Sequence, residues 1–543
     1  MHYILYGSKE GRWPNPEFDS GYYLLANPDV KKARLNPLLH YIKYGQYEGR
    51  KTNLNNEYRL LAVQNEPIKL IRILRVINKE NIKKGIDYIR RYGLKAFIRK
   101  LKMKFLLRKT DKDFTTINIP KIVLPDITEK ELKQYNEINI SVIIPTKNAG
   151  KEFEYLLKML RNQKGFNSIE IVIVDSGSTD ETLSIAKEYD SKIINILPED
   201  FSHSYARNIG AENASGNYLL FTVQDALPPT NTWLYNLMAV LKNNDIAAVS
   251  CAEIPREDAD LFYRVICWNH YNFLGVTNKD KISGMPEIPN YITLRQNGQL
   301  SDIACLISKD KFMNYKYRNS YAEDLDLGIR LIKDGYKIAF LSSTKIIHSH
   351  NRAAYYFLKR GYVDNLFLAD VFNDFPIPRI SFNNFVSDII FTYNFINEEI
   401  IKEIYKLVLP IKNVEIERMI EDKFKYVLEF RYPVNINVDD NNYIDDKFKI
   451  FIKNLFNEEY KKENKSYNGF LVSSLFDFLK ITFEYINNTY EFIDEELLKE
   501  LKTCIYKEYS MLCGAHLAYC YLNSSQKEKQ NLQKIHEELK EGI

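Results

Sequence analysis

The feature that most constrains this chain is an alternation of strand-like and helix-like segments between residues 137 and 372. The first strand-like segments, Ile138–Pro145 and Ile169–Val174, are nearly continuous runs of apolar, largely β-branched residues, as is typical of strands covered on both faces. Further strands are predicted at 192–196, 218–223 and 246–251, with helices at 155–160, 180–189, 204–214 and 232–241. Strands that alternate with helices in this way form a mostly parallel sheet with helices packed on its faces. We therefore predict an α/β domain over residues 137–372.

Length and composition indicate a folded protein of several domains. The chain has 543 residues, of which 45% are apolar and 27% charged, values close to those of globular proteins. The longest apolar runs fall far short of the ~18 residues that a membrane-spanning helix needs. Charged residues near the amino terminus argue against a signal peptide, so we expect a cytoplasmic protein. The six cysteines include no CxxC pair, so neither a disulfide framework nor a zinc ribbon is expected.

Three zones flank the α/β domain. Residues 1–60 contain a repeat, in which the segment His2–Arg12 recurs as His40–Arg50, and a small helical module is predicted there. Residues 61–136 are predicted to form a basic, amphipathic helical linker. Residues 373–543 have helical spacing and no chemical motif, so we expect an α-helical domain that binds a partner or forms a homo-oligomer.

The linker carries a local excess of positive charge. The net charge is +4 overall, but residues 68–109 hold 15 lysines and arginines against two acidic residues. One interpretation is a helix that lies in the headgroup layer at the inner face of a membrane. The other is a solvated helix packed on the next domain, because amphipathic periodicity is first of all a packing signal. Both interpretations stay open, whereas nucleic-acid binding is not expected because recognised motifs are missing.

Polar residues follow three of the predicted strands. They lie at Pro145–Asn148, at Asp175–Asp180 and at Gln224–Asp225. In an open parallel sheet the ligand lies outside the carboxyl ends of the strands, so we expect these residues to share one site. Asp175 suits a hydrogen bond from a nucleobase or ribose, but a strand-end carboxylate caps a turn about as often. No GxGxxG or GxxxxGKS/T motif follows a strand, which argues against dinucleotide-binding dehydrogenases and phosphate-loop enzymes.

Two further groups are candidates for chemistry. Glu323 and Asp324 are adjacent carboxylates at the predicted start of a helix, where they either act on a ligand or complement the helix dipole. His348 and His350 are two residues apart after a strand, which points both imidazoles to the same side of an extended segment. Such a pair is a candidate for metal binding, whereas a single histidine is more often a core residue.

These segments resemble the family 2 glycosyltransferases of the GT-A fold, over about residues 138–352. The resemblance rests on Ser141–Asn148 (SVIIPTKN) and Val174–Thr182 (VDSGSTDET). It is closest to the bacterial rhamnosyltransferase-like branch, through the segments Phe201–Gly210, Gly216–Ala226, Pro255–Asp258 and Leu300–Asp302. Several motifs in the right order make the resemblance specific. It implies a catalytic domain of the GT-A type, Rossmann-like with a mostly parallel sheet.

The resemblance implies roles for the candidate residues. Those that would hold the nucleoside of a nucleotide sugar are Pro145, Thr146, Asn148 and Asp175, with Arg207 reaching the base or ribose. Asp225 matches the last acid of the DxD motif, which contacts the donor and binds a divalent cation, Mn²⁺ or Mg²⁺. Val223 stands in place of the first acid of that motif. A metal-binding histidine is also implied, either His348 or His350, with His348 favoured.

The resemblance further implies an inverting, metal-dependent transfer reaction. Asp324 would act as the general base on the acceptor hydroxyl, Glu323 would orient the acceptor or the base, and Asp326 is the fallback base. The donor would be a UDP- or dTDP-sugar, with rhamnose as one candidate sugar. The acceptor would be a saccharide or a lipid-linked glycan of the cell surface. The alternative is a non-catalytic scaffold on a GT-A frame that binds nucleotide or saccharide, supported only by the missing first acid.

Overall fold

The computed structural model describes residues 127–540, apart from 320, 431, 433–436 and 458–468, together with residues 23, 27, 30 and 37–45. The chain divides into two compact units, 1–110 and 111–543. In the first unit, the helix α3 (Pro37–His40) continues into a π-helical turn, and its residues pack against Tyr23 and Val30. Most of the predicted repeat module and the whole basic segment 68–109 lie outside the described residues. The membrane and packing interpretations of that segment therefore stay predictions.

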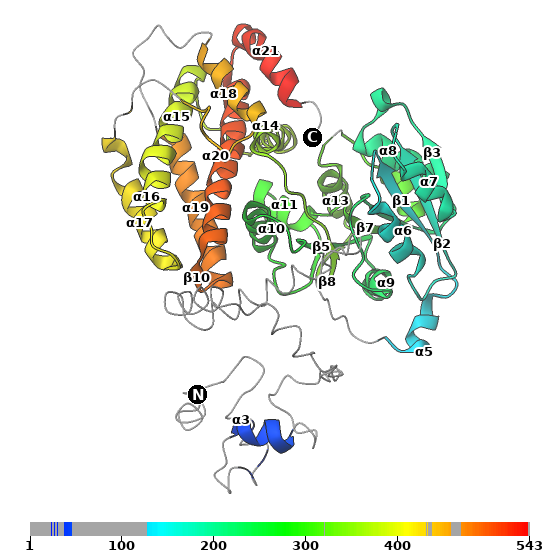
Figure 1. The fold of residues 1–543 in the computed structure, drawn as a ribbon. Helices are drawn as coiled ribbons and strands as arrows, with labels where there is room; N and C mark the ends of the chain where they lie inside the picture. The colour runs from blue at the N-terminus through cyan, green and yellow to red at the C-terminus, as the bar shows by residue number, and fades with distance from the viewer. Residues whose placement is uncertain are drawn as a thin grey trace. The chain divides into compact units, whose positions relative to one another are not determined.

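The second unit contains an eight-stranded sheet, which lies to one side of the carboxyl-terminal helices (Figure 1). Its strand order is β3-β2-β1-β4-β7-β5-β8-β6, and its pairs are parallel except those made by β7 and β6. The strands are β1 (Asn139–Thr146), β2 (Ser168–Asp175), β3 (Lys192–Asn195), β4 (Tyr218–Thr222), β5 (Ala248–Ile254), β6 (Lys281–Ser283), β7 (Ala304–Ser308) and β8 (Ile338–Ile347). All five predicted strands are present, and the prediction of an α/β fold with a mostly parallel sheet is confirmed.

Helices cover both faces of this sheet. Buried side chains of α6 (Phe153–Arg161), α7 (Thr182–Glu188) and α9 (Trp233–Asn243) share one apolar cluster with the strands. Those of α8 (His203–Asn213), α12 (Lys309–Tyr315) and α13 (Glu323–Lys333) belong to a second cluster. In α6, for example, the buried residues Phe153, Leu156, Leu157 and Leu160 follow the spacing of one helix face. Because each cluster joins a set of helices to the sheet, the domain has three layers, with the sheet between two layers of helices.

The remaining residues form a mainly helical domain that shares its core with two helices of the α/β part. Its helices are α15 (Phe382–Phe395), α16 (Lys402–Ile404), α17 (Asn413–Lys425), α18 (Asp446–Asn457), α19 (Phe470–Thr489), α20 (Glu495–Asn523) and α21 (Gln526–Lys540), beside a short ladder of β9 (Ile411–Lys412) and β10 (Phe492–Ile493). One apolar cluster joins them to α10 (Leu261–Leu274) and α14 (Ala354–Val371). The core is therefore continuous across the predicted boundary at 372/373. Among the described residues, none of the helices combines the length and apolarity needed to cross a membrane.

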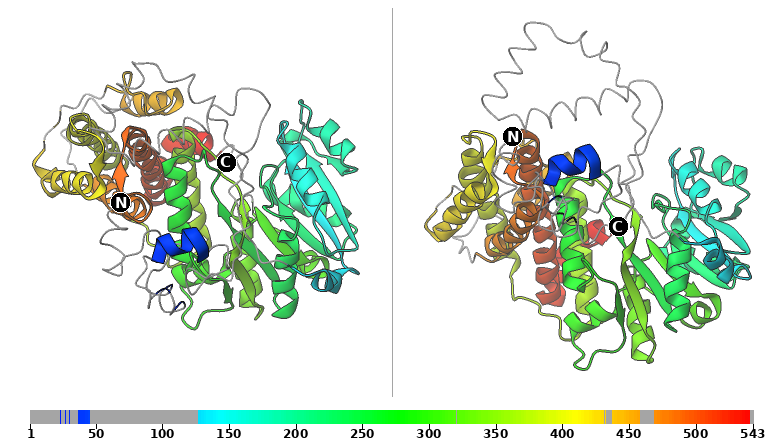
Figure 2. Two further views of the ribbon diagram at one scale, coloured as in Figure 1. Left: turned by 60° about the horizontal axis from the view of Figure 1, so that its bottom comes forward. Right: turned by 90° about the horizontal axis from the view of Figure 1, so that it is seen from below.

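The two parts meet most closely where α14 lies against α20 (Figure 2). A Cβ atom on Gly514 would lie 1.9 Å from the carbonyl oxygen of Leu358, and one on Gly361 would lie 2.0 Å from that of Met511. Glycine on both helices thus lets the two backbones touch. Ion pairs of Lys507 with Asp260 and of Arg264 with Glu500 also join α20 to α10 and the residue before it. The helical domain is consequently fixed to the α/β domain.

Replacing Gly514 by alanine tests this contact. In an ordinary helix interior the change from glycine to alanine stabilises by about 0.5–1 kcal/mol. Here the added Cβ overlaps the Leu358 carbonyl, so we expect Gly514→Ala to destabilise the protein by ~1–3 kcal/mol, measured by urea unfolding. Lys499→Ala, at an exposed position of the same helix, should change the unfolding free energy by less than about 0.5 kcal/mol. A Gly514→Ala variant as stable as the parent would show that the helices do not pack this closely.

Candidate active site

The loops that follow β1 and β2 are joined by the side chain of Asp175. Thr146 and Asp175 are register partners at the ends of the two strands, and the Thr146 hydroxyl donates to Asp175 Oδ1 at 3.0 Å. The backbone N–H groups of Gly177 and Ser178 donate to Oδ2 at 3.0 and 2.8 Å, and the Ser178 hydroxyl donates to Oδ1 at 2.5 Å. Asp175 is 1% exposed. Its carboxylate is therefore engaged by its own loop, which is the turn-capping arrangement.

Further hydrogen bonds join three loops at one edge of the sheet. The backbone N–H of Asn148 donates to the Ser178 hydroxyl oxygen at 2.8 Å, and Asn148 Oδ1 accepts from the backbone N–H of Thr179 at 2.8 Å. Gln224, after β4, accepts from the backbone N–H of Lys147 at 2.9 Å. Pro145 is the second-last residue of β1. The structure thus brings together the predicted residues that follow β1, β2 and β4.

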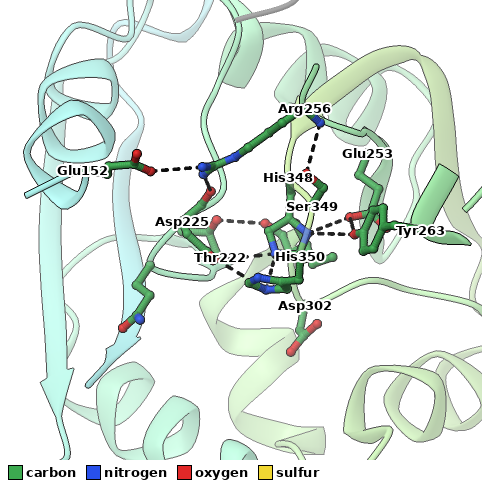
Figure 3. Close-up of polar contacts among 12 residues, drawn as sticks. Glu152, Thr222, Asp225, Glu253, Arg256, Tyr263, Asp302, His348, Ser349 and His350 are labelled. Atoms are coloured by element: carbon green, nitrogen blue, oxygen red, sulfur yellow. Dashed lines mark hydrogen bonds and ion pairs between the residues drawn. The ribbon is translucent and has the colours of Figure 1, made fainter. Parts of the chain in front are cut away.

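Asp225, His348 and His350 form a second group at this edge (Figure 3). A backbone bridge between Leu227 and Ile347 brings the segment after β4 to the end of β8. His348 Nε2 lies 3.6 Å from Asp225 Oδ1, His350 Nε2 lies 3.4 Å from Asp225 Oδ2, and the two Nε2 atoms are 3.1 Å apart. The expected orientation of both imidazoles to the same side is confirmed. One carboxylate and two imidazoles with converging ligand atoms form a donor set that suits a divalent transition-metal ion.

Two residues that sequence analysis missed lie behind His348. Glu253, in β5, places Oε2 2.7 Å from His348 Nδ1, and the Tyr263 hydroxyl donates to the same oxygen at 2.9 Å. Burial acts to raise the pKa of Glu253, but the hydrogen bond and charge of His348 hold it below its usual value. Burial likewise acts to lower the pKa of His348, and Glu253 more than offsets this, so that it is raised. For His350, burial and His348 lower the pKa to about 4.

Arg256 is a third residue that the sequence did not single out. Its guanidinium donates to the backbone oxygen of Asp225 at 2.7 Å and to the carboxylate of Glu152 at 3.0 Å. Its backbone N–H donates to the hydroxyl of Ser349, between the two histidines, at 3.1 Å. Arg256 therefore ties the Asp225 loop to the histidine segment. It lies within the quoted segment Pro255–Asp258, the one sequence signal that points to it.

Three carboxylates, those of Asp302, Glu323 and Asp324, lie around the guanidinium of Arg207 and are called the acid cluster. Arg207 is 1% exposed. Arg207 donates to Glu323 at 2.8 Å and forms an ion pair with Asp302. Glu323 is buried at the start of α13, and 25% of the Asp302 side chain is exposed. The terminal nitrogens of Arg207 bind carboxylates, and its expected contact with a base or ribose stays a prediction. Arg207 belongs with Glu323 rather than with Asp175.

The same cluster sets the protonation of Asp324. Burial raises the pKa of Asp324 well above its usual value, and the negative charges of Asp302 and Glu323 raise it further, against the opposing effect of Arg207. Burial also raises the pKa of Glu323. Asp326, by contrast, is held in an ion pair with Arg330 at 2.8 Å. Burial of a carboxylate beside other carboxylates, as at Asp324, is an environment that is common at functional sites.

Asp302 was not predicted from the sequence as a site residue, because it precedes a strand rather than follows one. Site residues are expected after the carboxyl ends of parallel strands, but β7 is antiparallel to β4 and β5. The first residue of β7, Ala304, pairs with Thr222, the last residue of β4. Residues just before β7 therefore lie at the same sheet edge as those just after β4. The quoted segment Leu300–Asp302 was the signal that was present.

Part of the chain is similar to known proteins. The model of glycosyl transferase family 2 matches residues 141–297. The O-antigen chain rhamnosyltransferase WbaN of Salmonella anatum is 29% identical over 234 residues, which is 39% of this chain and 67% of the relative. The O-antigen chain rhamnosyltransferase RfbN of Salmonella typhimurium is 26% identical over 218 residues, again 39% of this chain and 67% of the relative.

Among solved structures, one similar protein is the mannosyltransferase PcManGT of Pyrobaculum calidifontis, determined in complex with GDP-Man and Mn²⁺. It is 20% identical, with a TM-score of 0.34, and the match covers 51% of this chain and 72% of that protein.

Proposed function

From the premise that this chain is a family 2 glycosyltransferase of the rhamnosyltransferase-like branch, we propose that it transfers a sugar, with inversion, from a nucleotide sugar to a saccharide or lipid-linked acceptor in surface glycan synthesis. One observation carries the proposal. A metal-type triad of Asp225, His348 and His350 and a carboxylate of raised pKa, Asp324, both belong to the α/β domain that contains the match to glycosyl transferase family 2. The names of the two Salmonella relatives make rhamnose the first sugar to test.

In this proposal the loops after β1 and β2 hold the nucleoside of a UDP- or dTDP-sugar. Thr146, Asn148 and Asp175 are hydrogen-bonded into one network, and Pro145 precedes Thr146, the last residue of β1. Because the Asp175 carboxylate is already engaged, we assign it the role of shaping the loop, while backbone groups of the loop contact the nucleoside. Asp225 is placed to contact the donor as well as to bind a cation.

The triad is assigned to a divalent cation. Asp225, His348 and His350 would hold it, and Mn²⁺ fits this donor set better than Mg²⁺, because Mg²⁺ strongly prefers oxygen ligands. When bound, such an ion neutralises negative charge on the diphosphate of the leaving group. The missing first acid of the DxD motif is compensated in this proposal by the second imidazole.

Asp324 is assigned the role of general base. In a single displacement, the acceptor oxygen forms a bond to the anomeric carbon while the bond from that carbon to the diphosphate oxygen breaks. The hydroxyl proton passes to the Asp324 carboxylate. A carboxylate whose pKa is raised above its ordinary value is a stronger base when ionised, which suits this task. Glu323, fixed by Arg207, positions the first turn of α13, and the attack of one nucleophile on one carbon inverts its configuration.

The alternative is a scaffold that binds nucleotide without catalysis. Its only support is Val223 in place of the first DxD acid. A panel of UDP-, dTDP- and GDP-sugars, each incubated with Mn²⁺, Mg²⁺ or EDTA, separates the two by release of the nucleoside diphosphate and by nucleotide binding. Metal-dependent release from one donor supports the enzyme. Binding of a nucleotide without release, even with purified surface-glycan acceptors supplied, would favour the scaffold.

Asp324→Asn tests the assignment of the base. Asparagine has nearly the same size but cannot accept the hydroxyl proton, so we expect transfer to fall by about 10²–10⁴-fold, with donor affinity nearly unchanged by calorimetry. The matched control is Asp326→Asn, two residues away and paired with Arg330, which should keep most of the activity. Normal turnover by Asp324→Asn would remove Asp324 from its role.

The pH profile gives a second test, because Asp302 raises the pKa of Asp324. Asp324 is active when ionised, so transfer is lost as the pH falls through its pKa. Asp302→Asn removes a neighbouring negative charge and lowers that pKa, so we expect the acidic limb of kcat/KM to move to lower pH.

The control for this shift is Asp310→Asn. Asp310 is an exposed acid in the first turn of α12, after the far end of β7, and should leave the limb in place. An unchanged limb in Asp302→Asn, or a shift to higher pH, would contradict the proposed coupling.

A further inference from the structure

We infer that Glu253 is a positioning residue for the proposed metal site. Its carboxylate holds the ring of His348 and keeps the proton of that ring on Nδ1, so that the lone pair of His348 Nε2 faces Asp225. The inference rests on the proposed function, because it assumes that the triad binds a divalent cation. Glu253 is assigned no contact with the reacting atoms, because it acts through His348.

The geometry at His348 separates the two ring nitrogens. Nδ1 lies 2.7 Å from Glu253 Oε2, and a carboxylate oxygen accepts, so Nδ1 carries the proton. A neutral imidazole protonated at Nδ1 has its lone pair at Nε2. That nitrogen lies 3.6 Å from Asp225 Oδ1 and 3.1 Å from His350 Nε2. The lone pair is therefore directed into the space that the three ligand atoms share (Figure 3).

The sheet register brings Glu253 and His348 to the same face. The pairing of β5 with β8 shifts between Cys251 and Ala252, where Cys251 opposes Leu341 but Ala252 opposes Lys345. The three additional residues of β8 change which of its side chains share a face with those of β5. After the shift Glu253 opposes Ile346, and His348 follows Ile346 by two positions. The irregularity thus has a direct consequence for the site.

One face of α10 holds Glu253 in place from the other side. Tyr263, Cys267 and Tyr271 are spaced by four residues, so they lie on one face of this helix. The Tyr263 hydroxyl donates to Oε2 at 2.9 Å, Cys267 Sγ lies 3.9 Å from Oε1, and the backbone N–H of Glu253 donates to the Tyr271 hydroxyl at 2.8 Å. The carboxylate is therefore oriented by groups that do not belong to the triad. A histidine ligand that is held by an oriented carboxylate binds metal more tightly, and loss of the carboxylate typically lowers affinity 10- to 100-fold.

The test measures Mn²⁺ affinity of the full-length chain by electron paramagnetic resonance, with the Glu253→Ala and Glu253→Gln variants. We expect Glu253→Ala to weaken Mn²⁺ binding about 10- to 100-fold. Glu253→Gln should recover part of this loss, because the amide oxygen still accepts from Nδ1–H but lacks the charge. Glu287→Ala removes an exposed carboxylate outside the site and is the matched control. Binding of UDP and dTDP in EDTA should be unchanged in every variant.

The outcomes separate the inference from the proposed function. A parent protein that does not bind Mn²⁺ would overturn the proposed metal site and, with it, this inference. A parent that binds Mn²⁺ beside a Glu253→Ala variant of equal affinity would overturn the inference alone. If Glu253→Ala lowers the thermal unfolding midpoint, the isosteric Glu253→Gln carries the comparison. A loss of stability without any loss of Mn²⁺ affinity in that variant would make Glu253 a purely structural ion-pair partner.

Discussion

The in-register parallel pairing of β1 with β2 and β4 is the constraint on which the site depends. Because Thr146 opposes Asp175 at the strand ends, the loops that follow them leave the sheet together. Gln224 then joins the loop after β4 to the loop after β1. The antiparallel strand β7 adds the residues that precede it to this edge. Parallel strands alone would not have brought Asp302 there. The mixed sheet places residues that follow parallel strands beside residues that precede an antiparallel strand.

The acid cluster contains more negative than positive groups. Asp302, Glu323 and Asp324 face one guanidinium, that of Arg207, so full ionisation would leave an excess of negative charge in a largely buried place. Burial and mutual repulsion raise the pKa values of Glu323 and Asp324, so ionisation of both at once is disfavoured. Arg207 binds Asp302 and Glu323 directly, whereas the Asp324 carboxylate accepts the backbone N–H of Leu325. The arrangement explains why a buried arginine lies so close to a proposed base.

Much of the fold could be predicted from the sequence, because β-branched runs and helical spacing are local signals. The metal-type triad could be predicted as well, since Asp225 follows a strand and His348 and His350 alternate on an extended segment. Arg207 shows the limit of this approach. Its neighbours in space, Asp302 and Glu323, are about 100 residues away in the sequence, and no local pattern indicates that pairing. Glu253 lies within a strand, and its contact with His348 depends on a register shift that no sequence pattern predicts.

The helix α10 connects the helical domain to the site. Leu261, Phe262 and Val265 belong to the apolar core that α10 shares with α14 and the carboxyl-terminal helices. Tyr263, Cys267 and Tyr271 contact Glu253 instead. The helix is anchored further by the ion pair of Arg264 with Glu500 in α20. Because a rigid helix cannot move one face without the other, the packing of the last 170 or so residues bears on where the Glu253 carboxylate lies. The helical domain is therefore a structural support of the site.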